Sequence, residues 1–229
     1  MRHSSRKPMP VPGPESRVSR RGYGGRSAQE LLQERRERLM AAGLTLFCSV
    51  GFQHTRIDAI CAEAKVTPRH FYEQFDTREA LLLAIYEQVV AHARSQVQAA
   101  LQTPGLMPAE LINEAIRAFV RAYTEDARHA RLACVEVVGV SADMARRRRA
   151  VIHEFAGLIE AYANAMAQSG LLPKRDYGLS CLAMVGAVNE LMCEWLMGED
   201  PPSVAALTDE LLSMFAALVL GARALLPDA

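Results

Sequence analysis

The sequence predicts an all-α protein of two domains, and three observations support this fold class. Half of the 229 residues are hydrophobic, chiefly Ala, Leu, Val and Met, whereas aromatic residues make up only 6%; such a composition favours helices. Apolar residues recur three and four positions apart, and no stretch alternates as a strand would. The periodic stretches are bounded by Pro, Gly, Ser and Thr, which are common where helices begin and end.

Taken in order, the periodic stretches predict a series of helices separated by turn residues. The breaks at 103–105, 169–170 and 198–202 contain Gly or Pro, which end helices, and Ser203 is suited to cap the last one. The expected helices cover 28–49, 56–63, 67–73, 78–101, 108–125, 128–139, 143–168, 174–197 and 203–225.

Residues 55–75, TRIDAICAEAKVTPRHFYEQF, carry the most specific signal in the chain. We expect Thr55 to cap the first of two short helices, with Asp58 suiting its positive end. Thr67 is expected to cap the second helix, with Pro68 at the first helical position, where a missing N–H is not needed. Two short helices joined by a tight turn are typical of a helix-turn-helix.

The second short helix has one face for the core and another for a partner. Phe71 and Phe75 are four residues apart and should be buried, which leaves Arg69 and His70 on the other side. Such a helix can enter the major groove of DNA, where Arg can bond guanine with two hydrogen bonds. The plainer alternative is an ordinary pair of capped helices, which many all-α proteins contain.

From about Gln33 to Tyr86 the chain resembles the tetracycline-repressor (TetR) family of bacterial transcription regulators. The resemblance rests on an amphipathic first helix followed by an ordered set of motifs: Gly51-Phe52, Thr55, Phe71-Tyr72, Phe75 and the run REALL from Arg78. It implies an N-terminal three-helix helix-turn-helix DNA-binding domain at 28–77 and a C-terminal helical ligand-binding and dimerisation domain at 78–229.

Two positions depart from the family pattern. Lys65 stands in the turn where Gly is usual, so it should be strained by about 1 kcal/mol if the turn needs a positive φ; the alternative is a slightly different turn. Arg69 follows Pro68 where a small residue is common. It could read a base or only touch phosphate.

The resemblance assigns DNA-contact roles by position. Thr55, Tyr72 and Gln74 match phosphate-contacting positions, and Arg78 falls where a cation reaches the DNA backbone. Groove-facing positions are matched by Thr67, Arg69 and His70. The plainer alternatives are a simple cap for Thr55, a solvated side chain for Gln74 and a half-buried core residue for Tyr72.

The helices at 174–197 and 203–225 are apolar on more than one face, which indicates burial. By resemblance they form the interface of a homodimer, and two symmetric helix-turn-helices would read a palindromic double-stranded DNA operator. The alternative is a pair of ordinary core helices.

The resemblance also implies a pocket for a small-molecule effector between about 108 and 197. Its bulky candidates are Phe119, Tyr123, Phe155, Tyr162, Met166, Met184 and Trp195, although such residues are also common in plain cores. Glu136 lies in the apolar run LACVEVVGV and needs a partner if buried. That partner could be Arg121, Arg131, an arginine of 146–149 or a cationic ligand.

The net charge of zero conceals an uneven distribution. Residues 1–27 carry seven Lys and Arg against one Glu, whereas 28–80 are net −1 and 81–229 net −5. We expect 1–27 to be a disordered basic tail, either an arm that follows DNA phosphates or a solvated segment. An acidic C-terminal body is not expected to lie along DNA.

Other classes of function find little support in the sequence. The histidines at 54, 70, 92, 129 and 153 show no catalytic or metal-ligand spacing, so neither an enzyme, a cofactor nor a metal site is expected.

The five cysteines form no CxxC pair and are expected to be free, buried thiols, with a redox sensor as the alternative. Without a run of about 18 uncharged apolar residues or a secretory signal, we expect no membrane partner and a cytoplasmic location. A ligand-independent regulator, or an activator instead of a repressor, stays open.

Overall fold

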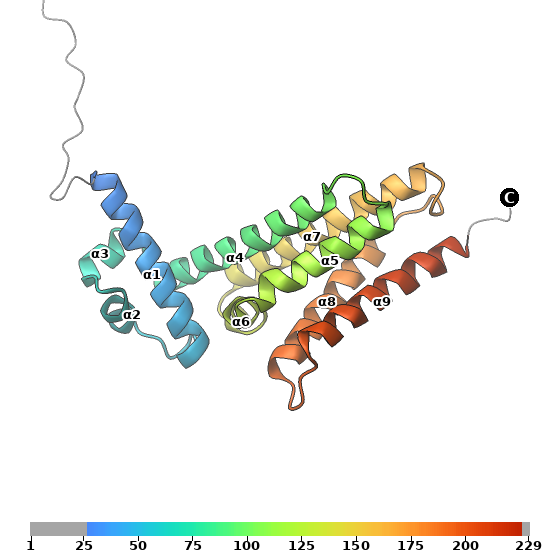
Figure 1. The fold of residues 1–229 in the computed structure, drawn as a ribbon. Helices are drawn as coiled ribbons and strands as arrows, with labels where there is room; N and C mark the ends of the chain where they lie inside the picture. The colour runs from blue at the N-terminus through green and yellow to red at the C-terminus, as the bar shows by residue number, and fades with distance from the viewer. Residues whose placement is uncertain (1–26, 226–229) are drawn as a thin grey trace, which may run out of the picture.

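The computed structural model describes residues 27–225, and every regular element in this part of the chain is helical (Figure 1). The predicted all-α class is therefore confirmed, with an N-terminal helix-turn-helix domain and a C-terminal helical domain. The predicted basic tail falls almost wholly outside the described residues. The boundary near residue 77 stays a prediction, because one cluster of buried side chains runs through both domains.

The N-terminal domain consists of α1 (Ala28–Val50), α2 (Ile57–Ala64) and α3 (Pro68–Tyr72). Helix α1 begins with a reciprocal capping box, in which the Ser27 hydroxyl accepts from the Glu30 amide and the Glu30 carboxylate accepts from the Ser27 amide. As predicted, Phe71 and Phe75 are buried against α1 and α2. These aromatic side chains hold the very short α3 in place.

Lys65 ends α2 in the left-handed conformation, with φ 53° and ψ 47°. Of the two alternatives left open by the sequence, the structure therefore has the turn with a positive φ, at a position where Gly would be unstrained. The Lys65 amide donates to Ala62 and the Val66 amide donates to Cys61, so the turn closes α2 tightly before α3 begins. The Lys65 side chain itself is exposed.

The predicted N-cap role of Thr55 is wrong. Arg56 occupies the N-cap position of α2, and no side chain caps this helix. The Thr55 hydroxyl instead donates to the Gly51 carbonyl at 2.8 Å, and its side chain is only 2% exposed. Because the chain turns between α1 and α2, the carbonyl groups at the end of α1 lie closer to Thr55 than the amides of α2.

Helix α4 (Arg78–Leu101) connects the two domains as one continuous helix of 24 residues. Thr77 caps it by accepting from the Ala80 amide. Its first turns pack against α1, and Gly43 permits the close approach, since a Cβ there would stand 2.8 Å from Ile85. The middle of α4 enters the C-terminal body. Any tilt of α4 would therefore move the helix-turn-helix.

The C-terminal body contains α5 (Pro108–Thr124), α6 (Ala127–Arg131), a short π-helical segment η1 (Leu132–Glu136), α7 (Ala142–Gln168), α8 (Gly178–Met197) and α9 (Val204–Arg223). Two predicted boundaries need correction. The helix expected at 128–139 ends at Glu136 after a change of helical pitch. The helix expected from 174 begins at Gly178, whose amide donates to the Asp176 side chain after the turn at Pro173.

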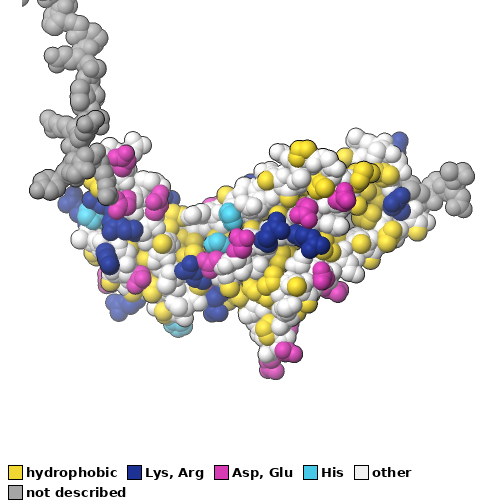
Figure 2. Space-filling view, in the orientation of Figure 1, with side chains coloured by type: hydrophobic (Ala, Val, Ile, Leu, Met, Phe, Trp, Pro, Cys, Tyr) yellow, Lys and Arg dark blue, Asp and Glu magenta, His cyan; other side chains and the backbone are white. Residues whose placement is uncertain are grey.

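Helices α8 and α9 form one side of the body and leave much of their apolar surface exposed (Figures 1 and 2). By length and composition both are apolar enough to cross a membrane, yet only 17% and 22% of their most apolar stretches are buried. Charged Glu190, Glu194, Asp209 and Glu210 interrupt these surfaces. Length and composition are weak evidence for membrane-spanning helices.

Candidate DNA-reading face and internal cavity

The exposed side of α3 carries the groove-facing residues that the sequence predicted. Thr67 and Arg69 are exposed, His70 is half-buried, and the Tyr72 side chain is 56% exposed. The Thr67 hydroxyl shares a hydrogen bond of 3.1 Å with Nδ1 of His70, which orients the imidazole. Figure 2 shows Lys and Arg side chains at this end of the molecule, interspersed with Asp and Glu. The face is thus polar, cationic in places and open.

Arg69 is the most accessible cation on α3, with its side chain 86% exposed. Its Nε donates to Glu73 Oε1 at 3.2 Å, one helical turn away. An exposed pair of this kind contributes at most about 1 kcal/mol. The Arg69–Glu73 ion pair can therefore be exchanged for a contact between Arg69 and DNA at a small cost in free energy.

Three of the predicted phosphate contacts have other roles in the folded chain. The buried Thr55 hydroxyl faces the end of α1 and is not available to DNA. The Arg78 guanidinium donates to the Thr55 carbonyl and lies 4.4 Å from the centre of the Phe52 ring. Gln74 is half-buried, and its amide donates to the Leu32 carbonyl at 3.4 Å. Thr55 and Arg78 therefore support the turn after α1, while a DNA contact by Gln74 or Arg78 stays a prediction.

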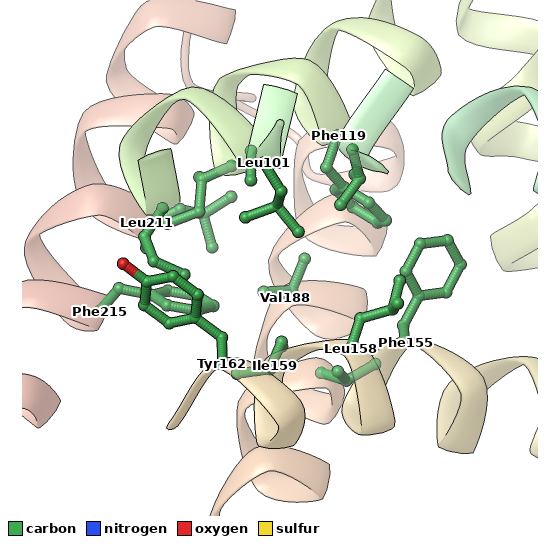
Figure 3. Close-up of a pocket in the computed structure, with 14 residues that line it drawn as sticks. Leu101, Phe119, Phe155, Leu158, Ile159, Tyr162, Val188, Leu211 and Phe215 are labelled. Atoms are coloured by element: carbon green, nitrogen blue, oxygen red, sulfur yellow. The ribbon is translucent and has the colours of Figure 1, made fainter. Parts of the chain in front are cut away.

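A cavity of about 80 Å³ lies inside the C-terminal body, and its wall is almost entirely hydrocarbon. Figure 3 shows side chains from α4, α5, α7, α8 and α9 pointing toward this common space. Tyr162 brings the single polar side-chain atom of the wall, and its hydroxyl donates to the Pro108 carbonyl. The lining residues are Val97, Leu101, Ile112, Ala115, Ile116, Phe119, Phe155, Leu158, Ile159, Tyr162, Val185, Val188, Leu211 and Phe215.

Some of the predicted pocket residues reach this cavity and others do not. Phe119, Phe155 and Tyr162 line it, and Tyr123 lines a second, adjoining cavity. Met184 and Trp195 pack around the main core instead, and Met166 belongs to a smaller cluster between α7 and α8. These three are corrected to core residues.

Sequence reasoning missed most of the aliphatic wall. Val97 and Leu101 come from the last turns of α4, and no sequence pattern assigns this part of the helix to a pocket. Ile112 and Ile116 could have been found, because they share with Phe119 the strongly apolar stripe of α5. Leu211 and Phe215 of α9 were attributed only to a dimer interface.

Glu136 is a structural residue and not part of either internal cavity. Its Oε1 accepts from Arg131 Nε at 3.2 Å, which is one of the pairings left open by the sequence. Its Oε2 accepts from the backbone amide of Phe52 at 2.8 Å. The side chain is only 7% exposed. The carboxylate therefore ties η1 of the C-terminal body to the turn between α1 and α2.

Replacing Glu136 by Ala is expected to lower the free energy of unfolding by about 1.5–3 kcal/mol, because the buried Phe52 amide loses a charged acceptor. Glu136→Gln should lose less, since an amide oxygen can still accept from Phe52. Chemical denaturation checks this, with the exposed Glu125→Ala as the matched control. A Glu136→Ala protein as stable as the Glu125→Ala control would contradict this role.

All five cysteines are free, as predicted, with Cys61 and Cys181 buried and the other three half-buried. Burial raises the pKa of the Cys48 thiol to about 11 and that of Cys134 to about 12. Because the thiolate is the reactive form, these environments favour inert thiols over a redox sensor.

Comparison with known proteins assigns the N-terminal region to a family. Residues 39–85 match the family model described as bacterial regulatory proteins, tetR family. This segment includes the whole helix-turn-helix and the beginning of α4. No curated protein matches the chain significantly in sequence.

Solved structures resemble the chain over most of its length. A protein from Syntrophomonas wolfei, described as a TetR-family transcriptional regulator, has a TM-score of 0.74 at 18% identity, covering 86% of this chain and 99% of its own. The fatty acid degradation regulator FadR from Bacillus halodurans has a TM-score of 0.72 at 14% identity, covering 82% and 95%. FadR from Bacillus subtilis, solved with stearoyl-CoA, has a TM-score of 0.70 at 13% identity, covering 78% and 96%. At these identities the likeness shows the fold.

Proposed function

We propose that this chain, a tetR-family protein by its N-terminal domain and its fold, is a ligand-responsive regulator of transcription. In this proposal it acts in the cytoplasm as a homodimer that binds a palindromic operator and is released by a small-molecule effector. The observation that carries the proposal is the course of α4. Its beginning packs against the helix-turn-helix, and its end lines the apolar cavity through Val97 and Leu101.

The cavity supports a response to a ligand. Apolar volume left unfilled costs stability, on the order of 2 kcal/mol for this size, and such cavities bind apolar molecules in preference to water. A ligand-independent regulator would need no such space in its core. FadR from Bacillus subtilis, which has the same fold, was solved with stearoyl-CoA. The effector proposed here is correspondingly apolar over much of its surface.

The exposed surfaces of α8 and α9 support the homodimer. Leu179, Met197 and Leu220 are more than half exposed, on helices that are otherwise apolar. A second copy of the chain would bury these side chains and would place two α3 helices on one side of a symmetric dimer. Such a dimer can read two half-sites about one helical turn of DNA apart or wider.

The proposed DNA contacts are Thr67, Arg69, His70 and Tyr72, all on α3 or its cap. Replacing Arg69 by Ala is expected to cost about 1–3 kcal/mol of operator affinity and to relax the preference at one base pair. Equilibrium binding to the operator and to its single-base variants measures both effects. Arg69→Lys separates base reading from charge, because Lys cannot form the two-bond contact with guanine. If Arg69→Ala lowers the affinity equally for every DNA sequence, Arg69 contacts only phosphate and does not read a base.

The response to a ligand is tested by a release assay on a protein–operator complex at fixed salt. Apolar compounds that bind in the cavity are expected to lower operator affinity at least tenfold, and Val188→Trp should abolish their effect by filling the space while leaving operator binding intact. Operator affinity that no cavity-binding compound alters would contradict the proposed regulation. Promoter activity in cells then distinguishes repression from activation.

A further inference from the structure

We propose that the effector is an amphipathic carboxylic acid whose carboxylate binds Arg148 in a second, polar cavity and whose hydrocarbon chain occupies the apolar cavity. This inference deepens the proposed function and rests on it for its regulatory meaning. The binding of such an acid can nevertheless be measured without DNA.

The second cavity adjoins the apolar one and differs from it in chemistry. Its volume is about 60 Å³, and it shares Phe119, Phe155 and Val185 with the wall of the apolar cavity. The rings of Phe119 and Phe155 meet edge to face, with centroids 5.5 Å apart. A single molecule that passes beside this pair would reach both spaces. It would meet hydrocarbon at one end and polar groups at the other.

The polar end is formed by side chains from four helical segments: Tyr86 of α4, Tyr123 of α5, Arg148 of α7 and Asn189 of α8. An Arg148 Nη donates to Asn189 Oδ1 at 3.2 Å. Most of the guanidinium's five N–H groups therefore stay available for a ligand. Asn189 thus lies at this cavity, although it comes from the apolar helix α8.

Arg148 has no acidic partner in the described part of the chain, and unlike the exposed Arg149 it is withdrawn from the surface. Arg146 pairs with Asp143, and Arg147 is held by both Glu87 and Glu154. Within residues 27–225, Arg148 forms no ion pair, although it is half-buried and lines a cavity. A cation withdrawn from water in this way is stabilised by an anion. The described part of the protein supplies no such anion, so an anionic ligand can take this place.

Two phenols complete a set of hydrogen-bond donors. Tyr86 and Tyr123 are 3% and 6% exposed, and neither hydroxyl has a hydrogen-bond partner in the described part of the chain. Burial raises the pKa of Tyr86 to about 12, while the nearby Arg148 guanidinium partly opposes this shift; burial also raises the pKa of Tyr123. Both phenols are therefore protonated donors. Donors gathered around a free cation favour a carboxylate over an amine or an alcohol.

The chemistry of the polar cavity suits a small anionic head group. A carboxylate is planar and small, and it suits the fork of a guanidinium. A coenzyme A thioester has no carboxylate at this position. We therefore expect the free acid to bind in preference to its coenzyme A thioester.

Calorimetric titration of the full chain without DNA tests the inference. The probes are hexanoate, octanoate, decanoate and dodecanoate, each compared with the alcohol, the amine and the coenzyme A thioester of the same length. At least one acid is expected to bind with an affinity tenfold or more above that of its alcohol, amine and thioester. Arg148→Gln should remove this preference for the acid and leave the affinity for the alcohol unchanged.

Arg146→Gln is the matched control, because it removes an exposed arginine of the same helix and should change nothing. If Arg148→Gln fails to fold, as judged by circular dichroism, Arg148→Lys and the double variant Tyr86→Phe/Tyr123→Phe provide the measurement; both should weaken acid binding several-fold. The inference is overturned if no acid binds, if acid and alcohol bind equally, or if the Arg148 variants bind the acid like the original chain. Acid binding that leaves operator affinity unchanged would refute the proposed regulation but keep the site.

Discussion

Replacing Gly186 by Arg is expected to leave the folded monomer intact, to prevent dimer formation and to weaken operator binding by about 100-fold or more. Gly186 lies on the exposed side of α8, in line with Leu179, Ala183, Glu190 and Met197. A Cβ added at this position meets no atom within 4 Å, so the monomer has room for the new side chain. In a dimer built on this surface, two large cationic side chains would have to fit between the copies, and a 100-fold loss corresponds to roughly 3 kcal/mol.

Gly157→Arg is a well-matched control for this experiment. Gly157 is also an exposed helical glycine with no atom within 4 Å of an added Cβ, but it lies on the polar side of α7. Analytical ultracentrifugation should find a dimer for Gly157→Arg and a monomer for Gly186→Arg. If the Gly186→Arg protein remains a dimer with full operator affinity, α8 is not part of the dimer interface.

Replacing Phe71 by Ala is expected to lower the free energy of unfolding by about 3–5 kcal/mol and to abolish operator binding. Phe71 is fully buried, and its ring contacts those of Tyr72 and Phe75 at centroid distances of 5.4 and 5.9 Å. Because α3 has only five residues, it has no stability of its own and depends on this anchor. Loss of the anchor should disorder the recognition helix before it affects the body.

Leu32→Ala controls for the general effect of removing an apolar side chain from this domain, since Leu32 is 42% exposed. Denaturant unfolding and operator titration are the two measurements. For Leu32→Ala we expect a change below about 1 kcal/mol and normal DNA binding. Near-normal operator affinity in Phe71→Ala would mean that α3 is held by other contacts.

Local signals in the sequence predicted the helix-turn-helix well. The position of Pro68 and the burial of Phe71 and Phe75 each follow from the chemistry of a few adjacent residues, whereas the positive φ at Lys65 was one of two alternatives raised by the family resemblance. The role of Thr55 could not be derived in this way. Its hydroxyl could bond either to the carbonyls at the end of α1 or to the first amides of α2. The path of the chain after Gly51 brings it to the carbonyls.

The cavity was predicted less completely, because it depends on which way each helix turns its apolar residues. Helix α5 has one apolar stripe, so Phe119 and Tyr123 were placed correctly in the interior. Helix α8 is apolar on several sides, and its sequence alone does not show whether Met184 or Trp195 faces a cavity. Arg148 lies in a run of four arginines, 146–149, which the sequence offered only as possible partners of Glu136. Only the packing of α4, α5 and α8 around it shows that it points inward.

We propose above that α3 reads a DNA sequence as part of a symmetric dimer. A binding selection from genomic fragments with the purified chain, at stated salt, measures this property. We expect the selected fragments to share a palindrome, and Arg69→Ala to alter the preference at symmetry-related positions. Binding that is sensitive to salt but indifferent to sequence would contradict it.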